Sequence, residues 1–187
     1  EVLATLGAGT LANDGELREG EKPGTWEIVG DPTEVSLVVA ARKTHADKKF
    51  AHFDRVAEIP FTSERKRMSV IARNATDAGK LTVFAKGAPD VLLSYCDRIY
   101  VNGAIRKLTE GDRQDILDTV ERLSREAYRT LGEAFRPLET DSLAQIPGIR
   151  TNSAGEISDI SEQAEAIEAH LVWCGMVGII DPPRTEV

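Results

Sequence analysis

The stretch that decides the fold is residues 66–86, which read KRMSVIARNATDAGKLTVFAK. Its two arms, 66–75 and 81–86, are rich in β-branched and other apolar residues, which favour extended backbone. The four residues between them, 76–79 (TDAG), have the polar and glycine composition of a hairpin turn. We therefore predict two strands joined by a tight turn, with a further strand at 56–61.

Upstream of this hairpin, residues 31–34 (DPTE) predict a helix start. Asp is at the cap, Pro at the first helical position, and Glu three residues after the cap. We expect this helix to run to about Thr44 and to bury Leu37, Val38, Ala40 and Ala41. Residues 1–12 are small and apolar, residues 13–15 (NDG) form a turn signal, and residues 16–25 are expected to be a charged loop.

Downstream of the hairpin, helices and strands are mixed. We expect a short helix from Pro89 and a longer one to about Ala127, which begins with a capping box between Thr109 and Asp112. Further predicted elements are strands at 98–102, 130–135 and 170–180, an irregular insert at 138–157, and an acidic surface helix at 158–169. This pattern predicts an α+β fold with a largely antiparallel, twisted sheet of about six to seven strands flanked by helices.

Composition is that of one soluble globular domain covering residues 1–187, with 41% hydrophobic and 29% charged residues. A formal charge of −8 argues against nucleic acid or an anionic membrane surface as the main partner. No apolar run reaches the roughly 20 residues that span a bilayer, and no segment resembles a signal peptide. The two distant cysteines are expected to be free thiols, and three scattered histidines do not form a zinc pattern. Both chain ends look abrupt, so we expect a piece excised from a larger protein.

Two glycine patterns resemble phosphate-binding loops. Residues 7–12 (GAGTLA) fit the dinucleotide fingerprint, with acidic Glu27 and Asp31 near the expected spacing. That fingerprint needs a helix directly after its glycines, whereas a turn signal follows here, so the dinucleotide interpretation is disfavoured. Gly79-Lys80 lacks the other residues of a Walker loop and is expected to belong to the hairpin turn.

Positive charge is concentrated between residues 62 and 86. This stretch has six basic and two acidic residues, a net of +4 in a chain of −8. The basic residues are Arg65, Lys66, Arg67, Arg73, Lys80 and Lys86. Two interpretations stand: a solvated strand edge protected by charge, or an anion site with Phe61 as a stacking face for a base.

Four short motifs resemble those of P-type ATPases. Residues 30–34 (GDPTE) resemble G-D/E-x-T-E, residues 61–70 (FTSERKRMSV) resemble F-S-x-x-R-K-x-M-S-V, residues 86–90 (KGAPD) resemble K-G-A-P-E/D, and residues 181–184 match D-P-P-R. Their order and spacing are similar to those of the calcium and sodium/potassium pump branch, including bacterial calcium-type pumps. The resemblance implies a nucleotide-binding domain, an antiparallel sheet flanked by helices, with residues 181–187 leading into the phosphorylation domain.

The resemblance also implies a function. Such a domain binds ATP, with Mg²⁺ accompanying the nucleotide and held mainly by the phosphorylation domain, to which the γ-phosphate is presented. The family's phosphorylation motif, Asp-Lys-Thr-Gly-Thr, is absent from this sequence, so we expect no catalytic residue here and no turnover by the isolated chain. The implied partners are the phosphorylation and actuator domains of the same parent chain, a cation pump of the cell membrane whose cytoplasmic part this is. A dinucleotide binder and a ligand-free interaction module remain as alternatives.

Nine positions match the family's nucleotide contacts: Asp31, Thr33, Glu34, Phe61, Lys66, Lys86, Gly87, Arg129 and Leu131. By resemblance, Phe61 stacks on adenine, Glu34 lies near the adenine amino group, and Lys86 closes the pocket around the base. Lys66 and Arg129 lie towards the ribose and phosphates, whereas some relatives carry a further arginine where this chain has Ser63.

Each main assignment has a structural alternative. Glu34 is also the third residue of a capping box, and Phe61 is also a candidate core residue. Lys86 is also a candidate turn lysine, and Arg129 a charge favoured at a helix end.

Overall fold

A computed structural model describes residues 1–22, 24–146, 149 and 160–180. Its centre is a seven-stranded sheet in the order β3-β4-β5-β8-β9-β6-β7, antiparallel except for the parallel pair of β6 and β9. In that order the strands are Phe53–Ile59, Arg67–Asn74, Leu81–Gly87, Arg129–Pro137, Leu171–Ile179, Cys96–Val101 and Ala104–Lys107. The predicted α+β class and the largely antiparallel sheet are confirmed.

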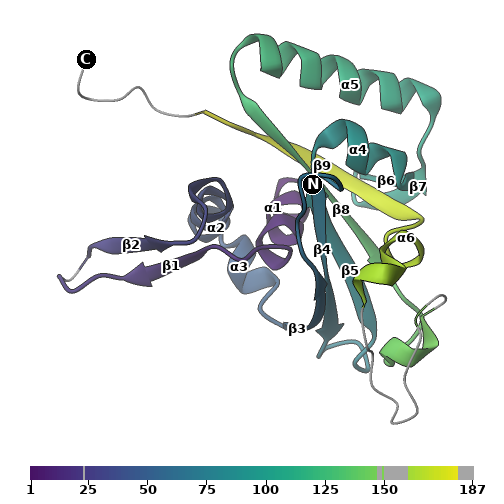
Figure 1. The fold of residues 1–187 in the computed structure, drawn as a ribbon, viewed down its shortest axis with the longest axis horizontal. Coiled ribbons are helices and arrows are strands. Elements are labelled where there is room, and N and C mark those ends of the chain that lie inside the picture. Colours follow the sequence, from purple (N-terminus) through teal and green to yellow (C-terminus); the bar gives the residue numbers. More distant parts are fainter. Residues whose placement is uncertain (23, 147–148, 150–159, 181–187) are drawn as a thin grey trace.

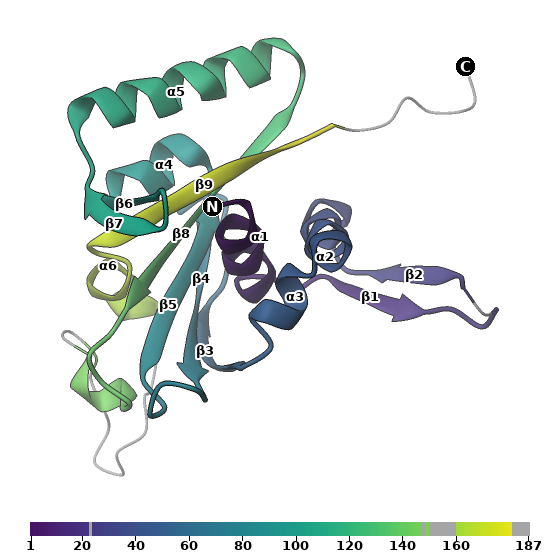
Figure 2. The same ribbon diagram turned by 180° about the vertical axis from the view of Figure 1, so that it is seen from behind.

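Helices cover both faces of this sheet (Figure 1). On one side lie α1 (Val2–Leu11), α2 (Pro32–Thr44) and α3 (Ala46–Lys49), and on the other α4 (Pro89–Ser94), α5 (Glu110–Arg125) and α6 (Ala164–Ile167). The reverse view in Figure 2 shows the same layers, with a small hairpin of β1 (Glu16–Glu19) and β2 (Trp26–Val29) projecting beyond α2. None of the described helices is long and apolar enough to cross a membrane.

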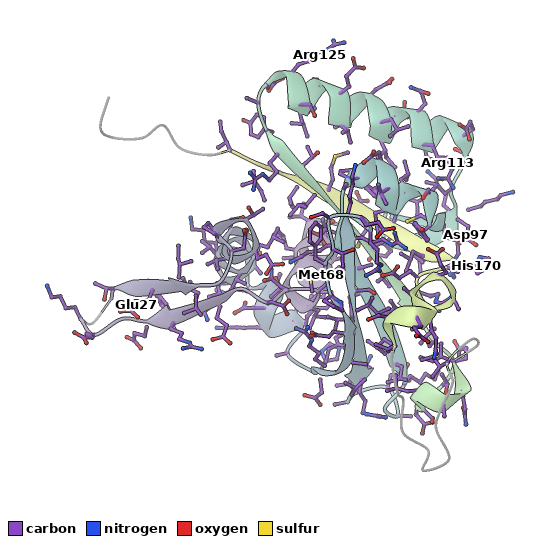
Figure 3. The ribbon with its side chains drawn as sticks, viewed as in Figure 1. Glu27, Met68, Asp97, Arg113, Arg125 and His170 are labelled. Atoms are coloured by element: carbon purple, nitrogen blue, oxygen red, sulfur yellow. The ribbon has the colours of Figure 1, made fainter. Side chains whose placement is uncertain are left out.

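The central strands β4 and β5 are buried on both faces, which explains their nearly continuous apolar sequence. Alternate residues enter two cores. Ile71 and Val83 belong to the larger core with α4, whereas Met68 and Phe84 pack with Ala8 of α1 in a second core. Met68 is labelled in Figure 3. The alternation places each even-numbered side chain of these strands on the α1 face.

Long-range polar contacts fasten the outer elements. In Figure 3 the side chains of Asp97 and His170 point toward one another, with His170 Nδ1 2.7 Å from Asp97 Oδ2 where the parallel strands β6 and β9 begin. Arg113 of α5 donates to the carbonyl oxygens of Leu93 and Cys96, at 2.8 and 2.5 Å. These contacts tie α5 to the end of α4 and to the first residue of β6.

Both predicted helix caps are present where the sequence placed them. The Asp31 side chain accepts from the Thr33 N–H at 2.7 Å and Pro32 is the first helical residue of α2, which ends at Thr44 as predicted. At α5 the reciprocal capping box between Thr109 and Asp112 is formed. The buried face of α2 was only partly predicted, because Val35, Leu37 and Ala41 are buried while Val38 and Ala40 are half-buried.

The glycines near the N-terminus lie inside α1. A Cβ on Gly7 would overlap the ring of Phe50, and one on Gly9 would lie 2.7 Å from a carboxylate oxygen of Glu133. The glycines therefore let a helix approach the sheet closely. Since a dinucleotide fingerprint needs them before its helix, that interpretation is not supported.

Two predicted segments differ in the structure. Residues 16–25, expected as a loop, contain strand β1 and the segment that joins it to β2, with Glu16 paired with Val29 and Glu19 with Trp26. The charged residues of β1 hid its strand pattern in the sequence. The predicted acidic surface helix is confirmed only in part: Ser161–Gln163 form a 3-10 helix and Ala164–Ile167 an α-helix, but Ile167 and Glu168 are fully buried. The sequence analysis did not predict strand β7. Parts of the predicted insert and helix lie outside the described residues, namely 147–148 and 150–159, and so do residues 181–187.

Candidate functional site

Sheet register gathers most of the predicted nucleotide residues at one end of three neighbouring strands. Gly87, the last residue of β5, pairs with Arg67 at the start of β4 and with Gly132 near the start of β8. Arg67, Gly87 and Gly132 thus lie side by side, and Lys66, Lys86 and Leu131 are their respective neighbours in sequence. Adjacent ends of antiparallel strands bring residues that are distant in sequence to one edge.

The beginning of α2 joins the same place through two side-chain contacts. Lys86 Nζ lies 2.7 Å from Glu34 Oε1, and Arg129 donates to the Thr33 hydroxyl at 2.7 Å. The cap residue Asp31 completes the group, and its hydrogen bond with Thr33 holds the pKa of its carboxyl below the usual value. Five of the nine predicted residues thus form one connected cluster.

Glu34 does not act as the capping-box residue of α2. Its Oε2 accepts from the backbone N–H of Asp14 at 3.2 Å, while Oε1 faces Lys86. The cap of α2 comes from Asp31 alone. The carboxylate of Glu34 therefore points from α2 towards Lys86 of the sheet, and 20% of the Glu34 side chain is exposed.

Lys86 is not a turn lysine. It lies within β5, and its side chain is only 6% exposed. Its ammonium is close to Glu34 but not aligned as a hydrogen bond. A buried ammonium without a full set of acceptors is costly, so packing alone does not explain a lysine at this position.

Glu133 lies beside Lys86 and was missed by the sequence analysis. The two residues are directly paired across β5 and β8, and Glu133 is fully buried beneath Gly9 of α1. Neither of its carboxylate oxygens has a hydrogen-bond partner in the described part of the chain. Burial raises its pKa well above the usual value, and the charge of Lys86 only partly opposes this. The signal that could have found it is an acid in the alternating apolar strand pattern LGEAF of residues 131–135.

Phe61 is not a core residue, since it is 56% exposed and lies two residues beyond the end of β3. Lys66 is also exposed and has a left-handed backbone with φ of 52°. The carbonyl oxygen of Lys66 accepts from the Ala88 N–H at 2.9 Å. A Cβ on Gly87 would lie 2.5 Å from that oxygen, so glycine permits this close approach. Among the described residues, no hydrogen bond or ion pair joins Phe61 or the Lys66 side chain to the cluster.

The basic stretch is mostly structural. Arg65 and Arg67 pair with Glu168, Arg73 donates to the carbonyl oxygens of Gly79 and Asp141, and Lys80 lies near Asp77 and Glu139. Arg67 also starts β4 at this edge, but its guanidinium is paired with Glu168. Of the six basic residues, this leaves Lys66 and Lys86 as candidates for binding an anion beside Glu34. The anion-site interpretation therefore narrows to these two, together with Arg129 from β8.

A cavity of about 390 Å³ lies away from this edge, near the opposite end of the same strands. Five rings line it: Phe50, Phe53, Phe84, Tyr100 and Phe135. None of the nine predicted residues does so. Because the charged and hydrogen-bonding groups converge elsewhere, we place the candidate site at the edge that holds Lys86 and Glu34.

Comparison with known proteins gives one consistent result. The chain matches the family described as "P-type ATPase, cytoplasmic domain N" over residues 1–186. It is 37% identical over 160 residues to a "Calcium-transporting ATPase 1" of Bacillus cereus, covering 84% of this chain and 16% of that protein. It is 35% identical over 181 residues to a "Calcium-transporting ATPase" of Bacillus subtilis and 28% identical over 210 to a "Sodium/potassium exporting P-type ATPase 1" of Saccharomyces cerevisiae. These alignments cover 96% and 97% of this chain and 18% of each relative, so the chain spans less than a fifth of their length.

Proposed function

Because this chain belongs to the family of P-type ATPase N domains, we propose that it binds ATP and presents the γ-phosphate to the phosphorylation domain of a cation pump. The observation that carries the proposal is the convergence of Lys86, Glu34, Thr33 and Arg129 at one sheet edge. These residues come from three separate elements, and each carries a group suited to a nucleotide.

The base would be held by Phe61 and Glu34. The exposed ring of Phe61 offers a stacking face, and a carboxylate such as that of Glu34 accepts a hydrogen bond from the adenine amino group. Lys86 would close the pocket around the base, because its ammonium lies 2.7 Å from Glu34. Asp31, Thr33, Gly87 and Leu131 would line the remainder.

The phosphates would lie towards Lys66 and Arg129. Lys66 is exposed, and Arg129 keeps four further N–H donors beside the one given to Thr33. No three His, Cys, Asp or Glu side chains cluster as metal ligands within the described ranges, and Asp31 and Glu34 already have partners. Mg²⁺ therefore enters the proposal only as the counter-ion of the ATP phosphates, held by the phosphorylation domain.

The contribution of this chain to catalysis would be orientation. The sequence has no Asp-Lys-Thr-Gly-Thr motif that could accept the phosphoryl group. Holding the base and ribose while the γ-phosphate projects outward turns the transfer into a reaction between pre-positioned groups. The phosphorylation and actuator domains of the same parent chain are the proposed partners.

A titration followed by amide chemical shifts tests the proposal. ATP should move the signals of residues 31–34, 61–66, 86–87 and 129–131, with smaller changes for NAD. Chemical-shift changes confined to residues that line the aromatic cavity would mean that the nucleotide binds there and not at the Lys86 edge. A chain whose signals respond to no nucleotide at millimolar concentration would be an interaction module instead.

A further inference from the structure

Glu168 is a buried carboxylate that plays no part in the nine-residue site. It directly follows α6 and is fully buried. Its Oε1 accepts from Arg65 Nη2 and from the Ser69 hydroxyl, the latter at 2.7 Å, and its Oε2 accepts from Arg67 Nε at 2.7 Å. All three donors come from one short segment, between 99 and 103 residues earlier in the chain.

Arg67 and Ser69 belong to β4, whereas Arg65 lies in the 60–66 connection between β3 and β4. That connection carries two of the proposed nucleotide residues, Phe61 and Lys66. Arg65 extends the contact, because its Nη1 donates to the carbonyl oxygen of Pro60 at 2.9 Å, directly before Phe61. The backbone N–H of Lys66 in turn donates to the Thr62 carbonyl oxygen at 2.8 Å. A chain of hydrogen bonds therefore runs from Glu168 through Arg65 to Pro60, the residue before Phe61. Thr62, on the other flank of Phe61, is held by Lys66, the next residue after Arg65.

Two further contacts hold the backbone of this turn: the Arg65 N–H donates to the Thr62 hydroxyl at 3.1 Å and the Ala88 N–H to the Lys66 carbonyl oxygen at 2.9 Å. Phe61, Thr62, Ser63 and Glu64 are exposed. Arg67, by contrast, is buried, with its guanidinium 3.8 Å from the centre of the Tyr95 ring. Removing one partner of this buried ion pair would leave the other charges uncompensated.

We propose that Glu168 is a positioning residue for nucleotide binding, which acts through Arg65 to hold the 60–66 turn so that Phe61 and Lys66 face the Lys86 edge. This rests on the proposed function above. Ordering an exposed aromatic ring before the ligand arrives lowers the entropy lost on binding. Glu168 itself would not touch the nucleotide.

The test compares ATP affinity in three variants of the chain. Glu168→Gln keeps the side-chain shape but removes the charge, and Arg65→Gln cuts the link to the turn while leaving Arg67 and Ser69 on Glu168. Glu165→Gln is the matched control, since it removes the exposed carboxylate that lies 3.3 Å from Arg67 but leaves Arg65 on Glu168. We expect the first two variants to weaken ATP by about 5- to 50-fold, below the loss of a full stacking contact, and the control to stay within about twofold.

A double-mutant cycle separates positioning from general destabilisation. If Glu168 acts through Phe61, then Arg65→Gln and Glu168→Gln should cost much less ATP affinity in a Phe61→Ala background than in the wild type. Amide hydrogen exchange without ligand should also rise in residues 61–66 of both variants, and not in β5. The Arg65 variant keeps this comparison available if Glu168→Gln does not fold.

Either of two results overturns the proposal: ATP affinity that is unchanged in both variants, or losses that are equal with and without Phe61. A wild-type chain that binds no ATP overturns this proposal together with the proposed function. ATP binding that is insensitive to Arg65 and Glu168 overturns this one alone.

Discussion

Lys86 and Glu133 face each other as a directly paired couple across β5 and β8, but the ammonium of Lys86 lies against Glu34 instead. The carboxyl of Glu133 is left fully buried and without a hydrogen-bond partner among the described residues. Lys86 thus pairs with Glu34, at the proposed adenine site, and not with Glu133. Because the Glu133 carboxyl is buried in this way, its protonation should change the free energy of unfolding with pH.

Stability should fall as pH rises because of Glu133. Burial raises the pKa of its carboxyl above the unfolded value near 4.5, so the folded chain binds the proton more tightly. Its contribution is complete below pH 4.5 and is lost progressively as pH rises towards the folded pKa. Glu133→Gln should therefore become increasingly more stable than wild type from pH 4.5 to pH 8, by denaturant unfolding at each pH.

The control for this measurement is Glu27→Gln, on the projecting hairpin (Figure 3), where the side chain is exposed. Its unfolding free energy is compared with that of wild type at the same pH values. A Glu133→Gln difference that does not change with pH, or that only matches the Glu27→Gln difference, would contradict the raised pKa of Glu133.

Glu34→Gln should reduce discrimination between ATP and GTP. Guanine carries a carbonyl where adenine has its amino group, so only ATP uses the Glu34 acceptor. A hydrogen bond to a charged group contributes about 1.5–3 kcal/mol, so ATP affinity should fall by roughly tenfold or more while GTP changes less. If the two affinities fall together and the melting temperature drops, Glu34 is only a structural partner of Lys86.

Phe61→Ala should weaken ATP binding by roughly 5- to 150-fold, the range expected for loss of a base-stacking contact of about 1–3 kcal/mol. Since the ring is 56% exposed, the variant should fold normally by circular dichroism. A folded Phe61→Ala chain that binds ATP like wild type would remove Phe61 from the site.

Lys86→Ala should weaken ATP, ADP and AMP to a similar degree, because its proposed place is beside the base and not the phosphates. The three nucleotides should bind wild type within about tenfold of one another, since exposed phosphates gain little from solvated cations. A loss that grows with the number of phosphates would place Lys86 at the phosphate end instead.

The isolated chain should show no ATP turnover. The acceptor motif of the family is absent from its sequence, so nothing receives the phosphoryl group. Labelled ATP with Mg²⁺ should leave no acid-stable phosphoprotein and release no phosphate above a blank without protein. Stoichiometric labelling would contradict the proposed division of labour between domains.

Local sequence predicted much of the fold correctly. The caps at Asp31 and Thr109, the hairpin turn at residues 76–79 and the helix start at Pro89 all depend on residues within a few positions of one another. Such signals survive in any tertiary context, because the hydrogen bonds that they form are short-range. The position of the chain in its family was also evident from four local motifs.

Tertiary structure decided which charges meet. From the sequence alone, Arg65 and Arg67 looked like solvent-exposed or anion-binding residues, and Glu168 like part of a surface helix; together they form a buried network. Likewise nothing local indicates that Lys86 reaches Glu34 or that Glu133 lies beneath Gly9. The reason is physical: burying a charge is favourable only when a partner arrives from a distant segment, and that partner is set by sheet register and helix docking, which the local sequence does not specify.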